Sequence, residues 1–190
     1  MSRRAALVAL ALLAGGLAGR AVRAQEPGPW LPSALTSFQG RDLKVESRLT
    51  PGLPAQVEKR LSSGLPTTAV WTVRLYVHRD LWWDGLKDER RYEVTAQFRP
   101  VAGDYTLERR LDGKLLETRV VPTREEAASA LSRLPSIPCF TMGAHLVGKP
   151  LVVRVRCAYG SDVALGLLPT STETDWVRSA IFEWTGGDER

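Results

Sequence analysis

Residues 69–78 of the chain read AVWTVRLYVH. Apolar and polar side chains alternate along this stretch, and a period of two residues is typical of a β-strand with one buried and one exposed face. The same alternation recurs at residues 43–49, 92–98, 105–111 and 151–159. Strands with one wet face favour antiparallel pairing, because parallel sheets are usually covered on both faces. The sequence therefore predicts an antiparallel β-protein.

Turn and helix signals complete the predicted fold. Asp112-Gly113 lies between two alternating runs and indicates a tight hairpin, so that residues 66–121 form a four-strand meander. Helices are predicted over residues 54–63 and 123–134, the second beginning with a capping box at its amino end. The predicted fold class is α+β, a mostly antiparallel twisted β-sheet or sandwich with two short helices.

The amino terminus has the pattern of an export signal. Arg3 and Arg4 precede an uncharged apolar run over residues 5–18, and small residues lead up to Ala24. We interpret this as a signal peptide cut between Ala24 and Gln25. An uncleaved membrane anchor is the alternative, and the paired arginines leave the twin-arginine export route open.

The expected organisation has three parts. A signal peptide occupies residues 1–24, a flexible leader rich in proline and glycine occupies residues 25–40, and a single β-rich domain occupies residues 41–186. We expect the exported chain to be periplasmic or secreted. It contains no later apolar segment long enough to span a membrane.

Removal of the signal peptide changes the charge argument. The whole chain has 26 basic and 21 acidic side chains, a net charge of +5, and four of the arginines precede Gln25. The exported chain has 22 basic and 21 acidic side chains, a net charge of +1. Because a nearly neutral domain lacks the field that attracts phosphates, nucleic acid is not an expected partner.

The two cysteines are Cys139 and Cys157. Exported chains lie in an oxidising compartment, so a disulfide closing a loop of about 18 residues is the first interpretation. Two buried free thiols are the alternative. The spacing does not match a metal-binding cysteine motif, and no metal site is expected.

The candidate binding residues are Trp82, Trp83 and Arg74. Neighbouring side chains on a strand point to opposite faces, so one tryptophan is expected in the core and the other at a binding surface. An aromatic plug at a sheet corner is the alternative. Arg74 belongs to an arginine-rich set of polar strand positions, which is either an ion-paired sheet face or a surface for an anionic ligand.

Catalytic signals are few. The histidines are His78 and His145, which we interpret as surface residues, and the chain has neither a nucleophile elbow nor a phosphate-binding glycine loop. We expect no catalytic residues and no cofactor. The favoured function is therefore a non-enzymatic binding module. The alternatives are a hydrolase with dispersed Ser, His and Asp residues and a carrier for an apolar ligand.

Several ordered motifs carry a family resemblance. They are Gly64-Leu65-Pro66, Trp82-Trp83-Asp84, Arg90-Arg91-Tyr92, Glu125-Glu126-Ala127 and Asp175-Trp176, followed by Trp184. The chain resembles domain of unknown function family 4390, exported bacterial proteins, over about residues 42–184. The resemblance implies no catalytic or binding residues. It implies as partner another protein of the cell envelope, such as a membrane sensor kinase.

Overall fold

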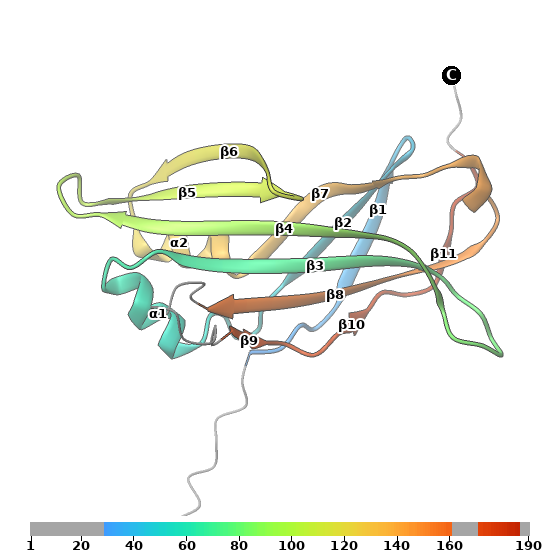
Figure 1. Cartoon of the computed structure of the whole chain (residues 1–190), viewed down its shortest axis with the longest axis horizontal. Helices are drawn as coiled ribbons and strands as arrows, with labels where there is room; N and C mark the ends of the chain where they lie inside the picture. Colours follow the sequence, from blue (N-terminus) through green and yellow to red (C-terminus); the bar gives the residue numbers. More distant parts are fainter. Residues whose placement is uncertain (1–28, 161–170, 187–190) are drawn as a thin grey trace, which may run out of the picture.

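The alternating stretch around Trp71 forms β3 (Thr67–Val77), which lies inside the larger of two antiparallel sheets. On one side β3 pairs with β4 (Gly85–Arg99), and on the other with β8 (Pro150–Gly160). Apolar side chains of β3 are buried at every second position, as the period-two pattern predicts. The computed structural model describes residues 29–160 and 171–186 (Figure 1).

Beyond β4 the sheet continues through β5 (Asp104–Leu111) and β6 (Lys114–Val121). The predicted meander over residues 66–121 is therefore confirmed. Asp112 and Gly113 have φ angles of 50° and 78°, and positive φ at both central residues is the mark of a type I′ turn.

The smaller sheet contains β1 (Ala34–Gln39), β2 (Asp42–Arg48) and β7 (Arg133–Thr141), in that order. β1 and β2 run obliquely across the long strands of the larger sheet (Figure 1). The two open sheets form a sandwich-like arrangement with two helices, which confirms the predicted fold class.

The predicted flexible leader over residues 25–40 is wrong for its described part. Trp30 and Thr50 exchange two backbone hydrogen bonds of 3.0 and 2.9 Å, and Leu31 and Ala34 are buried in the core. The folded unit thus begins before residue 41. The short strand β1 follows the prolines of this segment, and its pairing with β2 fixes it in place.

Residues 1–28 lie outside the described part of the chain. The predicted signal peptide and its cut between Ala24 and Gln25 belong to that segment.

The two helices are α1 (Ala55–Ser62) and α2 (Arg124–Leu131). At the start of α2 the hydroxyl oxygen of Thr123 accepts a hydrogen bond from the backbone N–H of Glu126 at 3.2 Å, as expected of an N-cap. The predicted second helix ran three residues too far. Leu134 belongs to β7 instead, where pairing with β2 takes over and buries its side chain.

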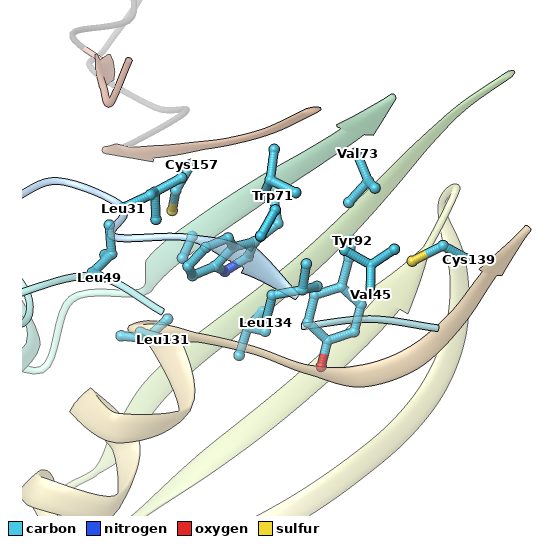
Figure 2. Close-up of a cluster of buried hydrophobic side chains, with 14 of the residues drawn as sticks. Leu31, Val45, Leu49, Trp71, Val73, Tyr92, Leu131, Leu134, Cys139 and Cys157 are labelled. Atoms are coloured by element: carbon cyan, nitrogen blue, oxygen red, sulfur yellow. The ribbon is translucent and has the colours of Figure 1, made fainter. Parts of the chain in front are cut away.

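The core lies between the two sheets and under the helices. Figure 2 shows Trp71 and Tyr92 from the larger sheet packed with Val45 and Leu134 from the smaller one. Trp71 and Val45 have no exposed surface, and Leu134 has none either. Close packing of this kind makes the sheet a rigid support for its connecting loops.

Three short strands line the outer side of β8. They are β9 (Ser171–Glu173), β10 (Val177–Arg178) and β11 (Phe182–Glu183). A short 3₁₀ helix, η1 (Ala144–Leu146), precedes β8. None of the helices within the described residues has both the length and the apolar character needed to cross a membrane.

Candidate functional site: the β3–β4 loop

Residues 78–84 connect β3 to β4, and this loop projects at one end of the molecule's long axis (Figure 1). Leu81, Trp82 and Trp83 in the loop are 90%, 77% and 91% exposed. We call these three residues the tip. Isolated exposed apolar residues are ordinary in proteins, but these three large residues are consecutive and form one exposed apolar patch on a projecting loop.

The tryptophans are placed differently from the prediction. We expected one of Trp82 and Trp83 in the core, because neighbours on a strand face opposite sides. β3 ends at Val77 and β4 begins at Gly85, so both tryptophans lie in the loop, where strand alternation does not apply. Both indoles face outward, and the plug interpretation is wrong as well.

Hydrogen bonds hold the two ends of the loop together. The Nδ1 atom of His78 lies 2.8 Å from Oδ1 of Asp84, and Arg154 Nη2 on β8 donates to Oδ2 of Asp84 at 2.5 Å. The backbone N–H of His78 also donates to the carbonyl oxygen of Pro150 at 2.8 Å. The loop is therefore fastened both across its base and to the neighbouring strand.

We call the hydrogen bonds that join His78, Asp84 and Arg154 the brace, and Asp84 is its negatively charged member. Its side chain is only 8% exposed. Burial acts to raise the pKa of the Asp84 carboxyl, but hydrogen bonds from His78, Arg154 and the backbone N–H of Arg79 outweigh it, so the pKa lies below its ordinary value. The carboxylate form is thus the one that fits the site.

The polar contacts of the histidine side chains in the described part of the chain are with carboxylates and an arginine. His78 contacts the carboxylates of Asp84 and, at 3.3 Å, Asp80. Within residues 29–160 and 171–186 no hydroxyl group is hydrogen-bonded to the ring of His78, so the hydroxyl of a catalytic triad is missing from the described site. His145 lies in η1 with an exposed side chain.

Arg74 lies on the outer face of β3, and its side chain contacts residues other than those of the tip. Its Nε donates to Glu89 on β4 at 2.5 Å, and its guanidinium lies 4.6 Å from the ring centroid of Trp176. The hydrogen bond that Arg74 donates to Glu89 raises the pKa of Arg74 above its ordinary value. The structure thus does not bring Arg74 together with Trp82 and Trp83 in one site.

The outer sheet face around Arg74 is ion-paired. Arg156 is paired with Glu173 and lies 4.7 Å from the ring of Trp176, while Arg154 lies 4.8 Å from the ring of Tyr76. In the strand register Arg154 lies between Arg74 and Arg178, and Arg74 lies opposite Glu89. Ion pairs of Arg74 with Glu89 and of Arg154 with Asp84 offset part of this positive charge. Of the two interpretations of the arginine-rich face, the geometry favours the ion-paired one.

A cavity of about 420 Å³ lies between residues 29–31 and residues 173–177. Trp30 and Trp176 form part of its wall, with the carboxylates of Glu173 and Asp175. This position is at the side of the sandwich, where the amino-terminal segment meets the last strands. It does not coincide with the tip or with the space between the sheets that an apolar-ligand carrier requires.

The predicted disulfide between Cys139 and Cys157 is not formed, since both cysteines are free and buried. Cys139 belongs to β7 and Cys157 to β8, and Figure 2 shows the two sulfurs on opposite sides of Trp71 and Tyr92. Nearness in sequence is misleading here because the two strands enter different sheets. Burial raises the pKa of Cys139 to about 12 and also raises that of Cys157, so both remain thiols.

Metal ligands are not gathered in the described residues. No group of three or more His, Cys, Asp or Glu side chains in that part of the chain is placed to hold a metal ion. The site therefore offers contact area, a fixed shape and a few charges.

Fold and loop together define the class of this protein as an antiparallel β-sandwich that presents a braced aromatic tip. The chain belongs to the family described as domain of unknown function (DUF4390), whose profile matches residues 32–162. This match confirms the family resemblance stated from the sequence motifs. Comparisons with curated proteins and with solved structures found no match.

Proposed function

We propose that this protein is an exported, non-enzymatic binding module of the bacterial cell envelope, and that the tip is its contact site. The single observation that carries the proposal is the exposure of Leu81, Trp82 and Trp83 on a loop whose base is fastened by hydrogen bonds. An unfastened loop of this composition would fold its apolar side chains back against the sheet to remove them from water.

Preorganisation supports a binding role. A loop already fixed in one shape loses little conformational entropy when a partner covers it, so more of the contact energy appears as affinity. Tryptophan suits such a contact because it offers a large apolar surface and an N–H donor. The braced loop is thus a sounder basis for binding than for catalysis.

The compartment and partner belong to the same proposal. The arginine-led apolar amino terminus supports a periplasmic or secreted location. The partner is a component of the envelope, and a protein such as a membrane sensor kinase is the candidate that the family resemblance implies.

Cell fractionation tests this function. The tagged full chain is expressed in a bacterial host, and the share of exported protein retained with the envelope is compared between wild type and a Trp82→Ala/Trp83→Ala variant. We expect the variant to be released into the soluble exported fraction. Leu115→Ala/Leu116→Ala is the matched control, because Leu115 and Leu116 are 49% and 51% exposed on the distant edge strand β6. Equal retention of wild type and tip variant would contradict the proposal.

A further inference from the structure

The geometry points to the surface of an anionic phospholipid bilayer as the partner of the tip. This inference rests on the proposed binding function and names its partner class. The tip is convex and its three apolar side chains stand clear of the sheet, which is the shape needed to enter the boundary between lipid headgroups and acyl chains. Tryptophan concentrates at that boundary because its ring is apolar and its N–H is polar.

The area of the tip favours a bilayer over a protein partner. A large aromatic side chain buries 150–250 Å² at most, so the tip supplies about 500 Å² in all. A stable protein–protein interface takes roughly 800 Å² from each partner, with few charges at its centre. A bilayer needs no matching surface, since each inserted apolar side chain is stabilised separately.

The residues around the tip are charged, and these charges disfavour a protein partner that would cover both the tip and its surroundings. Arg79, Asp80 and Lys87 are all exposed next to it. In a docked protein these groups would have to lose water around the apolar contact. At a membrane the same groups remain in the hydrated headgroup layer while only the tip is inserted.

The positive charge next to the tip indicates that the lipid headgroups are anionic. Asp84 and Arg154 neutralise each other at the base of the loop. The carboxylate of Asp88, next to Lys87, is paired with Arg90. Arg79, Lys87 and Arg178, whose Nη2 atom lies 3.0 Å from the ring of His78, then outnumber the carboxylate of Asp80. Each basic group near an anionic leaflet adds attraction, so phosphatidylglycerol-containing membranes are preferred over neutral ones.

The brace fixes how deep the tip goes. His78 and Asp84 close the loop at its base, and the charged groups around that base stop insertion at the headgroups.

Vesicle co-sedimentation tests the inference. Vesicles of phosphatidylcholine with phosphatidylglycerol are compared with vesicles of phosphatidylcholine alone, using exported protein purified from the envelope. Every variant is purified in the same way, so any contribution of residues before Pro29 is common to all. We expect wild type to bind the mixed vesicles more strongly, with an advantage that shrinks as salt is added.

Substitution of the tip supplies the decisive comparison. Leu81→Ser/Trp82→Ser/Trp83→Ser is expected to weaken binding to mixed vesicles by at least about tenfold, the loss that follows when one large apolar side chain no longer enters lipid. The control Leu115→Ser/Leu116→Ser is expected to stay within about twofold of wild type. Brominated lipid is expected to quench tryptophan fluorescence in wild type and in the control, but not in the tip variant.

The outcomes separate this inference from the function on which it rests. If wild type does not bind either vesicle, or if the tip variant binds as well as wild type, the lipid inference is overturned. Should the tip variant still be released from the envelope of cells in that case, the binding function stands and a protein partner takes the place of lipid. Unchanged envelope retention together with unchanged vesicle binding overturns both.

Discussion

The Nδ1 atom of His78 lies 2.8 Å from Oδ1 of Asp84, which joins the first and last residues of the loop that carries the tip. The same Nδ1 atom also lies 3.0 Å from Nη2 of Arg178 on β10, so the contact joins the loop base to a third strand. Five residues lie between His78 and Asp84 in the sequence. The exposed apolar side chains of the tip therefore belong to a loop whose two ends are joined by a hydrogen bond.

Replacement of Asp84 tests this brace. In Asp84→Asn the amide keeps the size of the side chain but leaves Arg154 without its carboxylate. Because the Asp84 side chain is almost fully buried, we expect the free energy of unfolding to fall by about 1–3 kcal/mol. Urea unfolding at neutral pH measures this. The control is Asp80→Asn, whose side chain is 94% exposed and whose loss should have little effect.

The pH dependence of the same pair has a fixed sign. The folded pKa of Asp84 lies below its unfolded value, so its contribution to stability is fully present above the unfolded pKa of about 4. The contribution is lost as pH falls through the lower, folded pKa. The stabilities of wild type and Asp84→Asn should therefore converge in acid. A gap that stays constant down to the acid transition would show that Asp84 acts through packing instead of charge.

Leu31 tests where the folded unit begins. Its side chain is 6% exposed and belongs to the core, whereas Leu35, four residues later, is 58% exposed. We expect Leu31→Ala to lower the free energy of unfolding by about 2–5 kcal/mol, as for other buried leucines. Leu35→Ala should change it by no more than about 0.5 kcal/mol. If both substitutions changed the free energy of unfolding equally and by a small amount, the prediction of a flexible leader over residues 25–40 would be supported after all.

Leu31 and Leu35 show which features of the fold the local sequence pattern predicts. Period-two alternation predicted the long strands, because each has a buried and an exposed face that the sequence records locally. β1 has only one buried residue, Ala34, and its place depends on pairing with β2. β7 was hidden for a similar reason, since its two prolines look like a helix stop while its ladder to β2 is a long-range contact.

The candidate site likewise has one part that the sequence predicts and one part that depends on long-range pairing. Trp82 and Trp83 were identified from residue type, and that choice of residues remains a prediction for binding. Their common exposure was not predicted because strand alternation was applied to both, whereas β3 ends at Val77 and β4 begins at Gly85. The brace could not be found at all, since Arg154 lies 70 residues from Asp84 and only the β3–β8 pairing brings them together.

Cys139 and Cys157 give a prediction that follows from their burial. We expect neither thiol to react with an aromatic disulfide reagent in the native protein, because burial keeps both protonated and out of reach of solvent. Both should react when the protein is unfolded without a reductant. Cys139→Ser should leave one reactive thiol in the unfolded protein. An unfolded wild type that reacts only after reduction would demonstrate the disulfide that the structure lacks.

Arg74 is expected to be dispensable for binding. Its guanidinium is occupied by Glu89 and Trp176, and both side chains of the ion pair are partly exposed. Arg74→Ala should therefore lower the free energy of unfolding by about 1 kcal/mol or less and leave envelope retention unchanged. Loss of retention comparable to that of the tip variant would place the binding surface on the outer sheet face instead.

Trp71 in β3 and Trp83 in the loop after β3 are expected to respond to substitution in opposite ways. Trp71 is fully buried between the sheets, and Trp83 is 91% exposed at the tip. Trp71→Ala should cost about 3–5 kcal/mol of stability, since it leaves a large cavity in the core. Trp83→Ala should leave stability within about 0.5 kcal/mol and act only on binding. Thermal unfolding measures both, with Trp71→Phe as the variant that keeps most of the core volume. If Trp83→Ala destabilised the protein as much as Trp71→Ala, the tip would be a packed part of the fold and its role in binding would have to be abandoned.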